Sequence, residues 1–363
     1  MRFPEFNEPW ETSTLQGIAE FSKGAGISKE QRSETGLPCI LYGELYTTYS
    51  NEVIEDVVSR TDLDPTDLVK SQSNDVIIPS SGETAEDIAT ARCVFDDNVL
   101  LGGDLNIIRL NEPHDGRFMS YQLNGIRKYD IARIAQGVSV VHLYSNELKK
   151  LSVSLPQSVE QKRIADFIGL LDRRIAVQSK LIEDLQQLKS AICKKLLSHS
   201  SWNEYIIDDI CDSVSFKEYI AEVEENGSFP IIQQGETPIL GYGNKKPYYN
   251  YNSVIIFGDH TLSLYKPQVP FLVATDGVKM LSPKPFVTRD FLYYLIETFM
   301  PISQGYKRHF SILKEQIIRL PSLKEQTIIG KRLSLLDTKI RIEQQLYDCY
   351  ISQKQYLLGQ MFI

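Results

Sequence analysis

The sequence predicts an α+β protein with two similar mixed α/β domains of short strands, each followed by a long helix, and with the two helices paired as an antiparallel coiled coil. The first observation is a repeated phrase: LPQSVEQKRIADFIGLLDRRI (155–175) returns as LPSLKEQTIIGKRLSLLDTKI (320–340), 165 positions later. A heptad pattern follows each phrase, and similar short strand patterns precede each one. An internal repeat of this kind predicts a pseudo-twofold relation between the two halves of the chain.

Both phrases begin a proline-free stretch of about 40 residues with a helical pattern. We expect Pro156 and Pro321 to open the two helices, because proline fixes φ where its missing N–H costs nothing. Steps of four and three residues give an apolar seam in both stretches, which is typical of a coiled coil. The seam consists of Ile164, Ile168, Leu171, Ile175, Ile182, Leu185 and Ile192, and of Ile329, Leu333, Leu336, Ile340, Tyr347, Tyr350 and Leu357.

Polar residues interrupt the two seams at matching places. Gln178 corresponds to Glu343, and Lys189 corresponds to Lys354. Polar seam residues weaken a coiled coil but fix its register and partner. The alternative is two unrelated amphipathic helices on a globular core, although such helices rarely sustain so long a strict seam.

The strand patterns place one domain before each long helix. The predicted boundaries are 1–154 for domain 1, 155–200 for the first helix, 201–319 for domain 2 and 320–363 for the second helix. Trp10 and Trp202 open the two domains. Each then reads as short strands separated by turn residues.

Particular segments of the two domains match each other. The buried strand pattern of DVIIPSSGET (75–84) matches NSVIIFGDHTLSLY (252–265), and the two short strands of NVLLGGDLNIIRL (98–110) match PFLVATDGVKMLSP (270–283). A Gln-Gly pair follows late in both, at 136–137 and 304–305. The frame is shared while the loops differ almost completely, so we expect the loops to bind two different things.

Composition is that of an ordinary globular protein, with 42% apolar and 24% charged residues. No stretch approaches the roughly 18 uninterrupted apolar residues of a membrane helix, and five scattered cysteines form no CxxC. We therefore expect a cytoplasmic protein with free thiols and no membrane contact. Net charge is −8, and residues 1–150 alone carry 14 basic and 24 acidic side chains. A free-standing nucleic-acid binder usually has a basic surplus, so any affinity for DNA would have to come from local patches or from a basic partner.

The sequence contains no recognisable catalytic constellation. The sequence lacks GxxxxGK[ST], HExxH and GxSxG, and it lacks the Asn-Pro-Pro-aromatic tetrapeptide of amino-methyltransferases. FSKGAG (21–26) has the composition of a glycine-rich cofactor loop, but a turn is the better interpretation because no clear helix follows. Neither a metal site nor a nuclease site is predicted, so the chain is interpreted as a reader and not as an enzyme.

The order of these parts resembles the specificity (S) subunit of type I restriction–modification enzymes. The two LP…EQ…LLD helix openings carry the resemblance, together with LPCILYGELYTTY (37–49), SSGET (80–84), FGDHT (257–261) and TDGVKML (275–281). It covers essentially the whole chain, although Trp10 arrives earlier than in many relatives.

The resemblance implies a non-catalytic subunit whose two target-recognition domains each read half of a split double-stranded DNA target. The paired helices would hold the half-sites about one helical turn apart and dock two methyltransferase (M) subunits. S-adenosylmethionine would bind in those partners, which methylate adenine, and this chain would need no cofactor. Restriction (R) subunits can join such complexes.

Candidate DNA-binding residues are loop residues whose amides, hydroxyls, carboxylates or cationic groups can meet base edges or phosphates. In domain 1 they are Lys23, Tyr46, Thr48, Ser80, Ser81, Glu83, Thr84 and Arg117. In domain 2 they are Gln233, Gln234, Asn244, Lys245, Lys246, Asp259, His260, Thr261, Lys279, Lys307 and Arg308. The segments GNKKPYY (243–249) and YKRHF (306–310) mix cations with aromatics. For each residue the alternative is a solvated or turn-capping role.

Two other function classes stay open at this point. One is a coiled-coil scaffold or adaptor whose two domains bind proteins, and the other is an enzyme with an unrecognised site. Co-purification with a methyltransferase bearing Asn-Pro-Pro-aromatic would separate the DNA reader from both.

Overall fold

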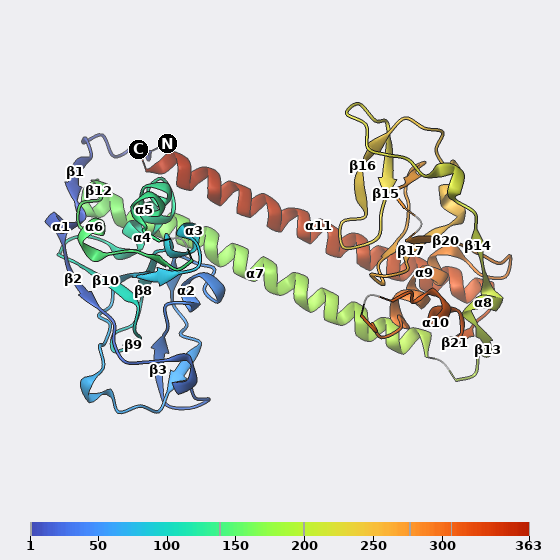
Figure 1. Cartoon of the computed structure of the whole chain (residues 1–363), viewed down its shortest axis with the longest axis horizontal. Helices are drawn as coiled ribbons and strands as arrows, with labels where there is room; N and C mark the ends of the chain where they lie inside the picture. Colours follow the sequence, from blue (N-terminus) through green and yellow to red (C-terminus); the bar gives the residue numbers. More distant parts are fainter. Residues whose placement is uncertain (1, 138, 199, 276, 306, 363) are drawn as a thin grey trace. The chain divides into compact units, whose positions relative to one another are not determined.

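The computed structural model describes residues 2–137, 139–198, 200–275, 277–305 and 307–362. Tyr306, which begins the predicted segment 306–310, lies outside the described residues. The chain divides into unit 1, with Met1–Ser179 and Leu346–Ile363, and unit 2, with Lys180–Gln345. Each long helix contributes to both units, and each is continuous in Figure 1.

Unit 1 contains domain 1, which is built from short strands and short helices. Its strands are β1 Glu11–Thr14, β2 Ala19–Lys23, β3 Leu37–Ile40, β4 Val53–Ile54, β5 Ser59–Thr61, β6 Val76–Pro79, β7 Ser81–Gly82, β8 Arg92–Val94, β9 Leu100–Leu101, β10 Leu105–Leu110, β11 Val141–His142 and β12 Ser152–Leu155. Its helices are α1 Leu15–Ile18, α2 Glu44–Thr47, α3 Ala85–Ile88, α4 Gly116–Asn124, α5 Lys128–Ile134 and α6 Ser145–Leu148.

Unit 2 contains domain 2, which is smaller but built alike. Its strands are β13 Asn203–Ile206, β14 Cys211–Val214, β15 Phe229–Ile232, β16 Ile239–Gly243, β17 Ile255–Gly258, β18 Leu264–Tyr265, β19 Leu272–Val273, β20 Val278–Pro283 and β21 Ile317–Leu320. Its helices are α8 Ile207–Ile210, α9 Arg289–Thr298 and α10 Phe310–Lys314.

The two domains share one topology. In domain 1 the order β2-β10-β6 runs through one sheet, and β14-β20-β17 repeats it in domain 2. A second sheet has the order β5-β3-β9 in the first domain and β16-β15-β19 in the second, each with one antiparallel and one parallel pairing. The first strand after each opening tryptophan pairs with the strand before each long helix, as β1 with β12 and β13 with β21. The prediction of two similar mixed α/β domains is confirmed.

The segment FSKGAG connects β2 with the second sheet by a close approach of two backbones. Gly24 donates its N–H to the carbonyl of Leu105 at 3.0 Å, and a Cβ at Gly24 would clash with the Gly102 carbonyl oxygen. The first three residues of the segment end β2, and the next helical element is only the 3-10 turn Lys29–Gln31, as expected from the absence of a clear helix signal. The absence of a Cβ at Gly24 is therefore needed for this close packing of the two backbones.

The long helices are α7, Ser158–Leu197, and α11, Leu323–Met361. They begin two residues after Pro156 and Pro321, so the expectation that proline opens them is wrong. At α11 the start is fixed by a reciprocal cap, because Ser322 donates its N–H to the Glu325 carboxylate and its hydroxyl accepts from the Glu325 N–H. Each proline instead presents its carbonyl to a glutamine side chain five residues later.

That glutamine explains the E-Q of the repeated phrase. Gln161 donates to the Pro156 carbonyl at 2.9 Å and accepts from the N–H of Asp115, the N-cap residue of α4, at 3.0 Å. Gln326 donates to the Pro321 carbonyl at 3.0 Å and accepts from the N–H of Thr288, the N-cap residue of α9, at 2.9 Å. In each domain the same side chain therefore joins the start of the long helix to the start of the domain's own helix.

Within each unit α7 and α11 pack antiparallel. In unit 1 a cluster joins Ile164 and Ile168 near the start of α7 to Leu357 and Met361 near the end of α11. In unit 2 the last turns of α7 join the first turns of α11 through residues such as Leu197 and Leu333. Every predicted seam position, polar interruptions included, is buried or half-buried. The predicted antiparallel coiled coil is confirmed, and the alternative of two unrelated helices is not.

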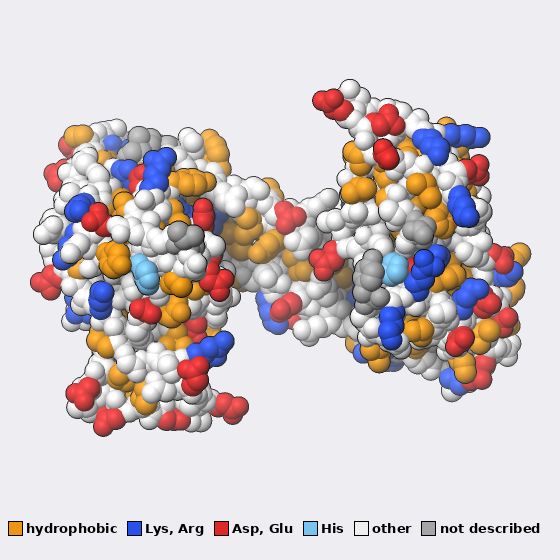
Figure 2. All heavy atoms as spheres, in the orientation of Figure 1, with side chains coloured by type: hydrophobic (Ala, Val, Ile, Leu, Met, Phe, Trp, Pro, Cys, Tyr) orange, Lys and Arg blue, Asp and Glu red, His pale blue; other side chains and the backbone are white. Residues whose placement is uncertain are grey.

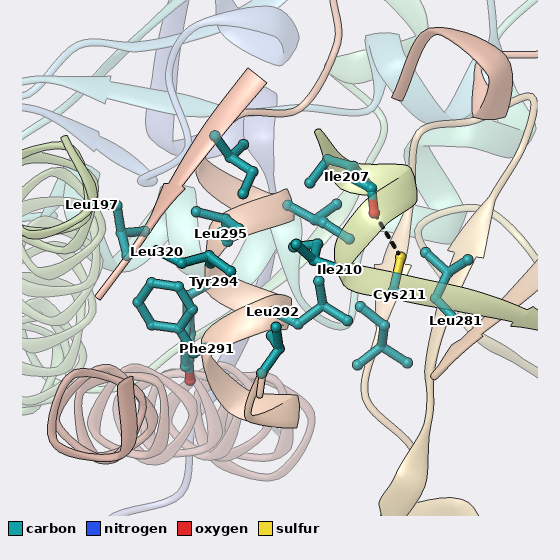
Figure 3. Packing of buried hydrophobic residues seen from close by; sticks show 14 of the residues in the cluster. Leu197, Ile207, Ile210, Cys211, Leu281, Phe291, Leu292, Tyr294, Leu295 and Leu320 are labelled. Atoms are coloured by element: carbon teal, nitrogen blue, oxygen red, sulfur yellow. Dashed lines mark hydrogen bonds between the residues drawn. The ribbon is translucent and has the colours of Figure 1, made fainter. Parts of the chain in front are cut away.

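The core of unit 2 is continuous from the helix pair into the domain. Phe291, Tyr294 and Leu295 of α9 lie between the long helices and the sheet residue Leu281. Figure 3 shows these side chains together with Leu197, Ile207 and Ile210, and it shows the Cys211 thiol bonded to the Ile207 carbonyl at 3.4 Å. Such a core seats the domain firmly on the helices. Among the described residues no helix is long and apolar enough to cross a membrane.

Candidate nucleic-acid interface

The predicted DNA-binding residues can be compared between domains because equivalent strands end at equivalent points. The last residue of β6, Pro79, pairs with Leu105, and the last residue of β17, Gly258, pairs with Val278. The next residue in each case donates its N–H across the turn, Ser80 to Asp104 at 2.7 Å and Asp259 to Gly277 at 2.9 Å. The carbonyl of the same residue accepts from the loop that follows the Gln-Gly pair, from Leu143 at 3.0 Å or from His309 at 2.9 Å.

Side chains around the end of β17 and its hydrogen-bonded loops form the unit 2 patch, which brings most of the domain 2 candidates together. It consists of Gln234, Asp259, His260, Thr261, Lys279, Lys307 and Arg308. The Gln234 amide oxygen accepts from the His260 N–H at 3.1 Å, and Lys279 lies 3.6 Å from the Asp259 carboxylate. Figure 2 shows Lys and Arg side chains beside a histidine on the visible face of this unit. Local positive charge is therefore present although the chain is acidic.

Asp259 and His309 form the buried base of the unit 2 patch. The Asp259 carboxylate accepts from the N–H of Phe310 at 2.8 Å. His309 is fully buried; its Nε2 accepts from the Gln304 N–H at 3.0 Å and its Nδ1 lies 3.1 Å from the Asp259 carbonyl oxygen. These partners require a neutral ring with the proton on Nδ1. Asp259 and His309 thus hold the loop that carries the exposed Lys307 and Arg308.

The unit 1 patch occupies the same place on domain 1 with different chemistry. It consists of the candidates Lys23, Tyr46, Ser80, Ser81, Glu83 and Thr84, with Asn106, His142 and Tyr144 beside them. His142 pairs with Ser81 between β11 and β7, and its ring stacks on Tyr144 with centroids 6.2 Å apart. Lys23 is the register partner of Asn106, whose amide donates to the Leu143 carbonyl at 2.9 Å. Burial raises the pKa of the Tyr46 phenol, so its hydroxyl stays protonated and can donate.

A cleft of about 690 Å³ adjoins the unit 1 patch. Thr47, Thr48, Asp104, Lys29 and Arg32 contribute to its lining. Its wall is held by Glu44, whose buried carboxylate accepts from the Leu41 N–H at 2.9 Å and from the Ser59 hydroxyl. Thr48 therefore lies within the cleft lining, near Asp104 at the rim of the patch.

Five predicted residues lie away from the patches or are engaged elsewhere. Arg117 stands at the start of α4, where it bonds Asp115 and Asp166 at 2.7 Å each, and these carboxylates raise its pKa against the opposing effect of burial. Asn244 and Lys245 bond Glu224 and the Ile220 carbonyl, and Lys246 follows them on the exposed loop after β16. Gln233 donates to the Thr237 carbonyl at 2.9 Å. Their DNA-binding role stays a prediction.

Sequence reasoning missed Asn106, His142, Tyr144 and His309. The signal was available in part, because the Gln-Gly pairs precede two of these segments by a few residues in both domains. Which residue of the following loop meets the end of β6 or β17 depends on tertiary hydrogen bonds, which no local pattern reveals. Among the described residues no group of three or more His, Cys, Asp or Glu could hold a metal ion.

The fold and the two patches define a class of protein with two divergent ligand-reading domains joined by a helix pair. The family model for the type I restriction modification DNA specificity domain matches residues 7–187 and again 199–348. The chain therefore belongs to this family, with two such domains, and the predicted type I specificity subunit is confirmed.

Relatives of similar length support the assignment. The chain is 23% identical to a putative type I restriction enzyme MjaX specificity subunit of Methanocaldococcus jannaschii, covering 94% of this chain and 90% of the relative. It is 20% identical to the type I restriction enzyme MjaVIII specificity subunit of the same organism, covering 93% and 88%.

Solved structures show the same fold. The S subunit of a type I restriction-modification system from M. genitalium superposes with a TM-score of 0.68 at 19% identity, covering 99% of this chain and 97% of that one. A chain from a structural study of complex assembly and conformational transition of the type I R-M system superposes with a TM-score of 0.56 at 17% identity, covering 98% and 97%.

Proposed function

We propose that this chain is the non-catalytic, DNA-reading subunit of its complex, and that each domain reads one half of a bipartite double-stranded target. The observation that supports this most is the shared frame of the two patches. Ser80 has the buried Asp259 as its counterpart, and the buried Asn106 has the half-buried Lys279, so equivalent positions of the two patches differ in chemistry. An asymmetric split target needs two such readers, because base edges are distinguished by their patterns of donors and acceptors.

The helix pair sets the distance between the half-sites. Each long helix is continuous, and the 40 residues of α7 span about 60 Å. A stiff element of this length can fix the spacing of two readers along a duplex. The prediction that the half-sites lie about one helical turn apart follows from the family resemblance.

Two methyltransferase subunits dock on exposed apolar positions of the long helices. Leu170 is 60% exposed and its repeat counterpart Leu335 is 63% exposed; Val177 and Ile342 are 70% and 50% exposed. Each pair is separated by 165 positions, so unit 1 and unit 2 present the same short apolar surface. Two equal surfaces favour two copies of one partner.

Chemistry resides in those partners. They would carry S-adenosylmethionine and methylate adenine, while restriction subunits join the complex separately. Their basic surfaces would also supply phosphate contacts, which compensates for the net charge of −8 on this chain. We expect the complex to work in the cytoplasm, where it meets DNA.

The test is to purify the complete complex and to map methylated adenines on DNA from its host. We expect one bipartite target with a fixed spacer. A chimera with residues 201–319 replaced by another specificity domain should alter one half-site and leave the other unchanged. Changes in both half-sites, or methylation by this chain alone, would contradict the proposal.

The docking surfaces have their own test. Leu170→Asp and Leu335→Asp should each yield complexes with a single methyltransferase subunit, and the double variant should yield none, as measured by native mass spectrometry. Both residues are exposed, so the melting temperature should stay close to that of the wild type. Retention of two partners by the double variant would exclude these surfaces.

A further inference from the structure

A buried polar network in unit 1 joins domain 1 to both long helices. The ammonium of Lys354, on α11, lies 2.6 Å from the Asp172 carboxylate of α7 and also pairs with Glu52. The hydroxyl of Tyr121, on α4, donates to Asp172 at 2.6 Å, and the lysine lies 5.9 Å from the centre of the tyrosine ring. All four residues are buried.

Unit 2 contains the same network built from the other repeat. Lys189, on α7, lies 2.7 Å from the Asp337 carboxylate of α11 and 2.7 Å from Glu297 of α9. The Tyr294 hydroxyl donates to Asp337 at 2.7 Å, and Lys189 lies 5.4 Å from the centre of the tyrosine ring. Tyr121 and Tyr294 occupy the same position, six residues after the N-cap residues of α4 and α9.

The repeat makes these networks reciprocal. Lys189 and Lys354 stand 165 positions apart, and so do Asp172 and Asp337. Each network therefore takes its aspartate from one long helix and its lysine from the other. The tyrosine and the glutamate come from the domain. In unit 2 both lie on α9, whereas in unit 1 Tyr121 lies on α4 and Glu52 lies just before β4.

The lysine of each network keeps its positive charge. Burial opposes the charged form of Lys354, but Glu52 and Asp172 outweigh that effect and raise its pKa. The pKa of Lys189 is raised in the same way by Asp337 and Glu297. Buried ion pairs often stabilise a protein no more than apolar residues of equal volume would, whereas they can impose one specific arrangement. The unit 1 network is buried, whereas the Asp337 and Glu297 carboxylates of unit 2 are about one-third exposed. The same arrangement of lysine, aspartate and tyrosine in both units argues for a positioning role.

We propose that the two networks, termed latches here, fix the orientation of each domain on its helix pair and thereby narrow the spacer length that the complex accepts. The proposal rests on the proposed function. Lys189, Lys354, Tyr121 and Tyr294 are positioning residues in this scheme. They act on the spacing between half-sites and leave the readout of bases to the patches.

The test compares methylation of duplexes that keep both half-sites and vary the spacer by one base pair. The complete complex is used, with Tyr121→Phe, Tyr294→Phe and Lys189→Met in this chain. We expect methylation at the shorter and longer spacers to rise about tenfold relative to the native spacer, a free-energy change of about 1.4 kcal/mol. Lys180→Met is the control, because Lys180 is an exposed lysine of α7 paired only within that helix among the interactions described.

A second variant separates positioning from stability. Lys189→Met combined with Asp337→Leu and Glu297→Leu replaces the charges with apolar groups and should recover the melting temperature. We expect its spacer tolerance to stay wide. If the spacer preference returns with the stability, or if none of the variants widens it, the latch proposal is wrong. If the wild-type complex itself shows no spacer preference, the proposed function fails instead.

Discussion

Gln161 and Gln326 should be among the most sensitive positions of the chain, although neither lies in a patch. Gln161→Ala would leave the Asp115 N–H and the Pro156 carbonyl without their side-chain partner at a buried site. An unsatisfied buried polar group costs about 1–3 kcal/mol, so the loss of two partners should lower the free energy of unfolding of unit 1 by about 2–6 kcal/mol. That is a large share of the roughly 5–15 kcal/mol that stabilises an ordinary domain. Gln326→Ala also removes a bond to the Phe286 carbonyl at 3.0 Å and should cost unit 2 at least as much.

The two tryptophans allow each unit to be followed by itself. Trp10 belongs to unit 1 and Trp202 to unit 2, so Trp10→Phe or Trp202→Phe leaves one fluorescent reporter for urea unfolding. With these backgrounds, Gln161→Ala should shift the transition reported by Trp10, and Gln326→Ala the one reported by Trp202. Hydrogen exchange at the Asp115 and Thr288 amides should accelerate in the matching variant. Lys162→Ala and Lys324→Ala, exposed neighbours in the same helix turns, serve as controls. The reasoning is refuted if either glutamine variant unfolds within about 1 kcal/mol of its control.

Three further predictions concern packing, thiols and the base of the unit 2 patch. Gly24→Ala should destabilise unit 1 by about 1–3 kcal/mol because its Cβ would meet the Gly102 carbonyl. Gly103→Ala is the control, because a Cβ at that position has open space. Equal melting temperatures of the two variants would disprove this. Iodoacetamide at about pH 8 should label the exposed Cys349 first. Burial raises the pKa of Cys39 to about 11 and of Cys211 to about 12, so these thiols carry almost no thiolate at that pH. Mass spectrometry measures the labelling rates, and equally fast labelling of Cys39 would contradict the prediction. His309→Ala removes two hydrogen bonds of about 0.5–1.5 kcal/mol each and should weaken recognition of the domain 2 half-site about tenfold. The domain 1 half-site should be unaffected and serves as an internal control. Equal loss at both half-sites in a methylation assay would count against a local role.

The helices and their seam could be predicted because the information is local and periodic. Every seam residue from Ile164 to Leu357 follows from counting steps of three and four, and none is exposed. The polar interruptions were visible as well, but their partners were not. Lys354 meets Glu52 across 302 positions of sequence, and no local pattern indicates that pairing. The exact helix starts also escaped prediction, because the Pro156 and Pro321 carbonyls are used by glutamine side chains and not by the first helical turn.

The candidate sites were harder to predict, because residue type alone does not distinguish a residue that contacts DNA from one that holds the structure together. Asp259 and Arg117 look alike in sequence as charged loop residues, yet one forms the base of the unit 2 patch and the other bonds two carboxylates beside α7. Conversely, His142 and Tyr144 gain their place only because β11 pairs with β7. Strand order and hydrogen-bond partners decide these cases, and both depend on contacts between distant segments.

The comparison of the two repeats separates support from recognition within one chain. Residues that join domain to helix keep both their identity and their partners, as with Gln161 and Gln326, or Asp172 and Asp337. Residues on the shared frame at the strand ends differ at equivalent positions, as with Ser80 and Asp259. Two copies under a purely structural requirement would have no reason to differ at these equivalent strand ends. The comparison therefore favours a conserved attachment of each domain to the helix pair, combined with variable recognition residues. A new half-site can then be acquired by changing patch residues, while the latches and the hydrogen bonds of Gln161 and Gln326 stay unchanged.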